Sequence, residues 1–344
     1  MDYKKAAEFL RSIKEKEGVV IVYNNDMDGM SAGAMMKKYL EKRGIKPYKI
    51  YQPMPPEKNF LRRVQTSLPD VIIFVDMAMD SDPNTINKLK GYSRMLIIDH
   101  HMIARDLNST NIVHVNPRFK DPKVYQSTAY LVYKLLSYME EDPDVWIAIL
   151  GATGDYNLEY SQDLVKKAQE YDSMKKYREA CHAIEASRIA KTFNCDEIVD
   201  FLTTVKSIDD ILEDRRFAEA AMLIENEIQS EISNANENVE TFGNLLMYNC
   251  KSKYNIRSVI STKIAEKHKT KVVIVYGEQG KSVIGSMRNQ GRTINTVDVL
   301  KKAAAGVKGF TGGGHDAASG FSVPEKDWKN FKENLAKVVA EYQK

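Results

Sequence analysis

Three apolar, β-branched runs near the start of the chain are each followed by residues that could hold a metal ion or move a proton. The runs and the residues after them are Val19–Tyr23 with Asp26 and Asp28, Val71–Val75 with Asp76, and Met95–Ile98 with Asp99, His100 and His101. Because ligands of open parallel sheets bind at the carboxyl ends of the strands, we expect these side chains to converge on one crevice. Asp155, which follows the apolar segment Val145–Leu150, is a further candidate carboxylate.

Several carboxylates at one sheet edge would repel one another strongly unless a cation lay among them. Oxygen-rich ligand sets with one or two imidazoles suit Mn²⁺ or Mg²⁺ better than zinc, and no cysteine belongs to the cluster. Two ions about 3.5–4 Å apart would clamp a phosphoryl oxygen and lower the pKa of a bound water. The pattern therefore favours phosphoester hydrolysis with two Mn²⁺ ions, or with Mg²⁺. Any single aspartate could instead cap a helix, but caps do not require His100 and His101.

Helical and strand-like stretches alternate in this part of the chain. The helical ones lie at 4–17, 32–43 and 126–140. This alternation predicts βαβ units and an α/β fold with a parallel sheet. The division that we expect is a catalytic, metal-binding domain at 1–190, a helical connector at 191–240 and a smaller α/β substrate-binding domain at 241–344.

The second half of the chain begins with a polar, helix-rich region in which Arg215 and Arg216 open an amphipathic stretch through Ile224, Ile228 and Ile232. The elements expected after it are strands at 244–248, 272–276 and 282–287, a helix at 296–305 and a turn at Thr311–His315. A last helix carries its apolar residues at helical spacing, which predicts that it docks on this domain. These residues are Trp328, Phe331, Leu335 and Val338.

The amino-acid composition indicates which classes of protein the chain can belong to. With 28% charged and 43% hydrophobic residues among 344, the chain is globular rather than disordered. Cys181, Cys195 and Cys250 are far apart, which implies neither a disulfide framework nor a zinc knuckle and fits a reducing cytoplasm. No apolar run approaches the roughly 20 residues that a membrane span needs. We therefore expect a soluble, cytoplasmic protein without a membrane partner.

Charge is distributed unevenly along the chain. Residues 1–240 carry 32 Lys and Arg against 39 Asp and Glu, whereas residues 241–344 carry 18 against 8. A basic segment of this kind is a hint of polyanion binding, although solvated surface lysines would give the same count.

These motifs resemble the DHH phosphoesterases, whose name-giving triplet corresponds to Asp99-His100-His101. Residues 25–32 are similar to the first motif of that family, Asp76 to the second and Gly154-Asp155 to the fourth. The last third of the chain resembles the DHHA1 domain. Its substrate-binding signature corresponds to Ser286-Met287-Arg288 and to residues 312–318.

The resemblance implies a role for each matched residue. Asp26 and Asp76 would hold one metal ion, and Asp28, Asp76, His100 and Asp155 the other, with Asp76 bridging the two. Asp99 would orient the imidazole of His100, and His101 would face the scissile phosphate. The substrate phosphate would be held by Arg288, by backbone N–H groups of Gly312, Gly313 and Gly314 in a concave turn, and by His315.

One position departs from many small-substrate members of the family. They begin the first motif with a histidine ligand and a proline, whereas this chain has Asn24 and no proline. The first motif is closer to that of the RecJ branch, and the compact layout resembles archaeal RecJ homologues. Without the histidine, the first ion has fewer protein ligands and is expected to bind weakly or to arrive with substrate.

The leading function is therefore a metal-dependent, RecJ-like exonuclease that hydrolyses single-stranded DNA or RNA, with the strand passing between the two domains. Tyr248, Tyr254 and Tyr276 are candidates for base stacking by position alone. One alternative is a hydrolase of short oligonucleotides, cyclic dinucleotides or 3′-phosphoadenosine phosphate. Another is a non-catalytic scaffold for replication or repair proteins. None of these patterns gives the oligomeric state.

Overall fold

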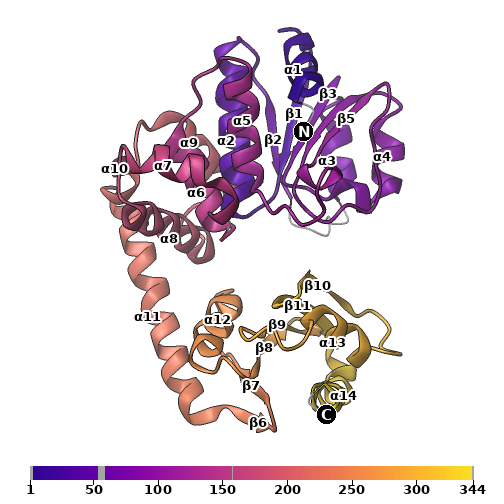
Figure 1. Cartoon of the computed structure of the whole chain (residues 1–344), viewed down its shortest axis with the longest axis vertical. Helices are drawn as coiled ribbons and strands as arrows, with labels where there is room; N and C mark the ends of the chain where they lie inside the picture. Colours follow the sequence, from indigo (N-terminus) through magenta and orange to yellow (C-terminus); the bar gives the residue numbers. More distant parts are fainter. Residues whose placement is uncertain (1–2, 53–58, 157, 343–344) are drawn as a thin grey trace. The chain divides into compact units, whose positions relative to one another are not determined.

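Two compact units make up the chain, and each is described here by itself (Figure 1). A computed structural model describes residues 3–52, 59–156 and 158–342, without the side chain of His315. Unit 1 comprises Met1–Ala221 and unit 2 comprises Met222–Lys344. The long helix α11 (Arg215–Asn238) runs from the first unit into the second.

Unit 1 is an α/β structure. Its strands are β1 (Val19–Tyr23), β2 (Tyr48–Tyr51), β3 (Val71–Val75), β4 (Arg94–Ile98) and β5 (Ile112–Val115). Its helices are α1 (Tyr3–Ser12), α2 (Met27–Lys42), α3 (Phe60–Thr66), α4 (Pro83–Leu89), α5 (Thr128–Tyr138), α6 (Val145–Gly154), α7 (Gln162–Gln169), α8 (Met174–Ala190), α9 (Cys195–Thr204) and α10 (Asp209–Leu212), with short 3₁₀ turns η1 (Met79–Ser81), η2 (Pro117–Phe119) and η3 (Glu159–Ser161).

The five strands form one parallel sheet in the order β2-β1-β3-β4-β5, which confirms the predicted α/β class. Side chains alternate between the two faces of each strand. Ile21 and Ile73 pack into a core with α1, α2, α5 and α6, whereas Val22 and Phe74 pack into a second core with α3 and α4 (Figure 1). Burial on both faces explains why the strands are continuous apolar runs in the sequence.

A glycine allows α6 to lie close to α2 and α5. A Cβ on Gly151 would lie 2.4 Å from Cβ of Ala129, 3.0 Å from Cβ of Ser31 and 3.1 Å from Oδ1 of Asp28. Real Cβ atoms do not approach other atoms so closely. The missing side chain at Gly151 therefore fixes the spacing of the helices that carry Asp28 and lead to Asp155.

Unit 2 contains a mixed sheet with helices. Its strands are β6 (Glu240–Phe242), β7 (Leu245–Asn249), β8 (Val272–Gln279), β9 (Ser282–Arg288), β10 (Thr311–His315) and β11 (Ala318–Pro324), and its further helices are α12 (Arg257–Lys267), α13 (Thr296–Ala303) and α14 (Trp328–Glu341), the last preceded by the 3₁₀ turn η4 (Glu325–Asp327). The strand order is β10-β11-β9-β8-β7-β6, and only β7 and β8 are parallel. Phe331 and Leu335 of α14 are buried in the core of this unit, as their helical spacing predicts.

The expectation of a turn at Thr311–His315 is wrong. This segment is the edge strand β10, which pairs with β11 in antiparallel register. Glycine has a low intrinsic propensity for β-strands, but pairing with a neighbouring strand overrides this local preference. Gly314 has φ +139°, and a Cβ there would lie 2.4 Å from the carbonyl oxygen of Ala318. The glycines thus permit a close hairpin rather than a loop.

Among residues 3–52, 59–156 and 158–342, no helix combines the length and the apolar character that crossing a membrane requires.

We predict that Gly151→Ala lowers the free energy of unfolding by about 1–3 kcal/mol, because the added methyl group overpacks the contact with Ala129 and Asp28. Urea unfolding followed by circular dichroism measures the change. Gly91→Ala is the matched control, since nothing lies within 4 Å of a Cβ at that position. Equal unfolding midpoints for the two variants would contradict the packing argument.

Candidate metal centre

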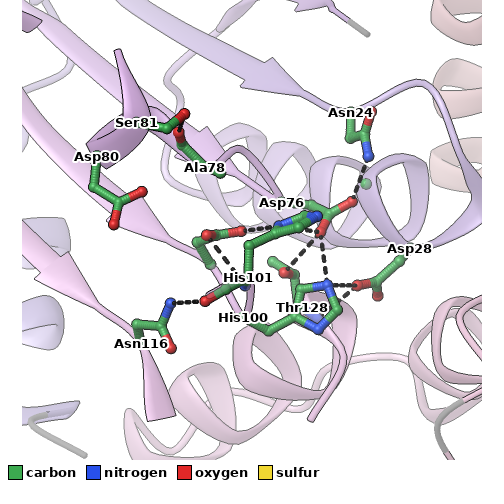
Figure 2. A network of polar contacts seen from close by, with 12 residues as sticks. Asn24, Asp28, Asp76, Ala78, Asp80, Ser81, His100, His101, Asn116 and Thr128 are labelled. Atoms are coloured by element: carbon green, nitrogen blue, oxygen red, sulfur yellow. Dashed lines mark hydrogen bonds and ion pairs between the residues drawn. The ribbon is translucent and has the colours of Figure 1, made fainter. Parts of the chain in front are cut away.

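Acidic and histidine side chains meet at the carboxyl ends of β1, β3 and β4, as the sequence predicts (Figure 2). Two groups could each hold a metal ion, because one ligand atom from every member lies within 4.8 Å of the others. One group is Asp76, His100 and His101, and the other is Asp28, His100 and Asp155. His100 belongs to both groups and is the centre of the cluster.

The imidazole of His100 is surrounded by carboxylates. Its Nε2 atom lies 3.3 Å from Oδ1 of Asp76 and 4.0 Å from Oδ2 of Asp28, and its Nδ1 atom lies 3.6 Å from Oδ2 of Asp155. The residue is 3% exposed, and within the described part of the chain Nδ1 makes no hydrogen bond. A buried ring nitrogen without a hydrogen bond, set among carboxylate oxygens, is a donor set that fits a divalent cation.

Hydrogen bonds hold two of the buried carboxylates of the cluster in place. Asp28 accepts hydrogen bonds from the backbone N–H groups of Thr128 (2.6 Å) and Ala129 (2.8 Å) at the start of α5. Asp76 accepts one from Nδ2 of Asn24 (3.1 Å) and one from the Thr128 hydroxyl (3.2 Å). Asp76 also has φ +60°, a strained conformation for a residue other than glycine that is common at functional sites.

Burial and mutual repulsion disfavour the charged forms of these carboxyl groups. Burial, followed by the neighbouring Asp76 and Asp155, raises the pKa of Asp28 well above its usual value. Burial and the nearby Asp26 do the same for the pKa of Asp76. A divalent cation among them would reverse this effect, because it stabilises the ionised ligands.

Asp26 lies at the edge of the cluster rather than within either three-residue group. Its Oδ1 atom accepts the backbone N–H of Gly29 and so caps α2, while Oδ2 accepts a hydrogen bond of 2.7 Å from Asn24. The Asn24 amide therefore connects Asp26 with Asp76. It does so from the position where many family members have the histidine ligand.

Asp99 pairs with a different histidine from the one expected. Its Oδ1 atom lies 2.7 Å from Nδ1 of His101, so the expectation that Asp99 orients His100 is wrong. Burial alone would lower the pKa of His101, but the charge and hydrogen bond of Asp99 raise it to about 10. Burial would likewise raise the pKa of Asp99, yet His101 lowers it to about 2. The two side chains form an ion pair at neutral pH.

Sequence analysis misses three residues beside the cluster, Thr128, Tyr125 and Arg118. Only Thr128 has a signal in the sequence, because it follows Ser127 at a helix-capping position. The ring of Tyr125 stacks on His100 with 5.2 Å between centroids, and its hydroxyl donates a hydrogen bond of 3.0 Å to Asp155. Burial, together with Asp155, raises the pKa of Tyr125, so its phenol stays protonated. Arg118 donates from Nε to the carbonyl oxygen of His100 at 2.7 Å.

Unit 2 places Arg288 and the glycine run in one sheet, on β9 and β10, with β11 between them. Arg288 on β9 pairs with Ala318 on β11, which pairs in turn with His315 on β10. The Arg288 guanidinium donates hydrogen bonds to the hydroxyls of Thr262 (3.0 Å) and Ser258 (2.6 Å) on α12. The side chain of His315 lies outside the described part of the chain.

Two of the three tyrosines proposed for base stacking belong to the core of unit 2. Tyr248 is 3% exposed and donates a hydrogen bond to the buried Glu231, and Tyr276 is 7% exposed. Neither ring has a face available to a base, so that expectation is wrong for both. Tyr254 is partly exposed, and the ammonium group of Lys253 lies over its ring.

Family models match both units. Residues 18–154 match the DHH family, N-terminal domain, and residues 249–344 match the DHHA1 domain. No curated protein matches the sequence significantly.

Solved structures resemble the chain at low sequence identity. RecJ from Thermus thermophilus in complex with Mn²⁺ gives a TM-score of 0.76 at 16% identity, over 98% of this chain and 55% of that one. The chain thus spans about half of that RecJ. CDC45 from Entamoeba histolytica gives 0.65 at 11% identity, over 99% of both chains. A pGpG-specific phosphodiesterase from Vibrio cholerae gives 0.53 at 14% identity, over 94% of this chain and 99% of that one.

At these identities the structural likeness establishes the fold, and the two family models establish the relationship. Together with the grouped Asp and His residues, they support a metal-dependent phosphodiesterase. The chain therefore belongs to the DHH family, with a DHHA1 domain after its DHH domain and a RecJ-like fold.

Proposed function

We propose that the protein is a metal-dependent exonuclease that hydrolyses single-stranded DNA or RNA. The observation that carries the proposal is the buried His100, whose two ring nitrogens lie among the carboxylates of Asp28, Asp76 and Asp155. The likeness to RecJ supports a nucleic acid as substrate. In this proposal residues 1–190 carry the chemistry, residues 191–240 connect, and residues 241–344 bind substrate.

The proposed ligands are divided between two ions. Asp26 and Asp76 serve one of them, and Asp28, Asp76, His100 and Asp155 serve the other, so that Asp76 is shared. Four carboxylates with one imidazole favour Mn²⁺, with Mg²⁺ as the alternative. The bound ions would polarise the phosphoryl group and lower the pKa of an attacking water.

His101 is the proposed contact to the scissile phosphate. Since Asp99 holds Nδ1, the nitrogen left to face a substrate is Nε2, and the charge and hydrogen bond of Asp99 raise the pKa of the ring. A protonated Nε2 donates a hydrogen bond to a non-bridging phosphoryl oxygen, where negative charge grows in the transition state. Arg288 and the backbone of Gly312, Gly313 and Gly314 would hold a phosphate of the substrate in unit 2.

A second candidate is the hydrolysis of short oligonucleotides, cyclic dinucleotides or 3′-phosphoadenosine phosphate by the same residues. The structural likeness to a pGpG-specific phosphodiesterase favours it. The likeness to CDC45 favours a third candidate, a scaffold for replication or repair proteins. The complete set of acidic and histidine residues opposes a purely non-catalytic role.

We predict that Asp76→Asn abolishes stabilisation by Mn²⁺, because the variant loses the shared carboxylate. Wild-type protein should melt at a higher temperature with Mn²⁺ than with EDTA, since a ligand that binds only the folded state stabilises it. Differential scanning fluorimetry measures both shifts. Asp121→Asn removes an exposed carboxylate and is the matched control. An Mn²⁺ shift that persists in Asp76→Asn would refute the assignment of Asp76 as the shared ligand.

End-labelled single-stranded DNA and RNA, from dinucleotides to roughly 30-mers, test the substrate. In Mn²⁺ the wild-type protein should produce a ladder from one end of the long strands, because successive terminal phosphodiesters are cleaved. Gel electrophoresis of the products also gives the polarity and the sugar preference. Asp76→Asn serves as the control for contaminating nucleases. Turnover of only the shortest substrates would favour the second candidate, and no turnover would favour the scaffold.

Arg288→Ala should raise KM by roughly tenfold and leave kcat nearly unchanged, because it removes a charged hydrogen bond to bound phosphate in both ground and transition states. Steady-state kinetics on a labelled oligonucleotide separate the two constants. Lys337→Ala removes one exposed charge from α14 of the same unit and should change neither. An unaltered KM for Arg288→Ala would show that Arg288 is not a substrate contact.

A further inference from the structure

Arg118 lies beside the metal-binding cluster and has no part in the proposed catalytic mechanism. It belongs to η2, which follows β5, and its side chain is partly exposed. Its Nε atom donates to the carbonyl oxygen of His100 at 2.7 Å, and Nη1 donates to the carbonyl oxygen of Pro122 at 2.7 Å and contacts Sδ of Met102 at 3.0 Å. Across residues 3–52, 59–156 and 158–342, Nη2 has no acceptor.

The charge of Arg118 is uncompensated. All its partners are neutral atoms, and no described carboxylate lies within 4.0 Å of its guanidinium, although His100, whose carbonyl oxygen it binds, lies among the carboxylates of the cluster. The guanidinium lies over the ring of Tyr125, 5.7 Å from the centroid, and that ring stacks on His100. Arg118 is therefore fixed in position at the metal cluster, with one amino group left for an anion.

The charges of the proposed centre leave a place for such a cation. Four carboxylates, from Asp26, Asp28, Asp76 and Asp155, would balance two divalent ions, and Nδ1 of His101 is already engaged by Asp99. The ions would engage the scissile phosphate, so the neighbouring phosphate of a strand must find its counter-charge in the protein. A guanidinium is well suited to this because its planar fork matches phosphate oxygens.

We propose that Arg118 binds the substrate phosphate next to the scissile one, which makes the rim of the metal centre in unit 1 a phosphate subsite separate from Arg288. This inference rests on the proposed function, because it takes a nucleic acid strand as the ligand. A purely structural role is the competing explanation, since the same hydrogen bonds tie the His100 segment to the Pro122 loop.

Salt dependence distinguishes the two roles. Each phosphate neutralised on a single strand contributes about 0.7 to the slope of log K against log salt concentration. We expect Arg118→Gln to make that slope less negative by about 0.7. Fluorescence anisotropy with a labelled, phosphorothioate-linked 12-mer measures binding in saturating Mn²⁺, because this backbone keeps its charge and resists hydrolysis.

Two further variants complete the experiment. Arg11→Gln removes an exposed arginine from α1, which leads into the opposite, amino end of β1, and should leave the slope as in wild type. Arg118→Lys keeps the charge but not the fork, so it should keep the slope and bind more weakly. Isothermal titration with Mn²⁺ alone reports whether each variant preserves the His100 segment.

The outcomes separate the hypotheses. A reduced slope in Arg118→Gln alone supports the phosphate subsite, whatever happens to Mn²⁺ affinity. A wild-type slope in Arg118→Gln, with or without weaker Mn²⁺ binding, overturns the subsite and leaves Arg118 a structural clamp. If the wild-type protein binds no nucleic acid while it binds Mn²⁺, the proposed exonuclease function fails together with this inference.

Discussion

Repulsion among buried carboxylates around His100 is the interaction on which the rest of unit 1 depends. Asp28 and Asp76 are each almost fully buried, and both have pKa values raised by burial and by their neighbours. The fold offsets part of this cost with hydrogen bonds from the start of α5 and from Asn24. The remaining cost would be lowered by a cation among these groups.

Steric constraints position the same groups. Gly151 lets α6 approach α2 until a Cβ would collide with both a neighbouring helix and the Asp28 carboxylate. Asp76 takes a left-handed conformation that directs its carboxylate toward Asn24 and Thr128 (Figure 2). Strain of this kind persists only where surrounding contacts hold it. Here the surrounding contacts come from the parallel strands on both sides of β3 and from the hydrogen bonds to Asp76.

Cationic side chains of the two units differ in the groups that surround them. His101 is paired with Asp99, whose carboxylate lies 2.7 Å from Nδ1 and raises the pKa of the ring. Arg118 is surrounded by neutral acceptors and by the ring of Tyr125. Arg288 in unit 2 is held by two hydroxyl groups. Among the described residues, Arg118 is thus held in place without a carboxylate beside its guanidinium.

The amino-acid sequence alone indicates the parallel sheet and the cluster at its edge, because strands buried on both faces must be apolar throughout and the residues after them must meet at their carboxyl ends. It also determined the docking of α14 through the spacing of Phe331 and Leu335. The folded chain was needed to see that Asp99 pairs with His101, that residues 311–315 form a strand, and that Tyr248 is buried. Those outcomes depend on side-chain directions and on partners distant in the chain, which local patterns do not encode.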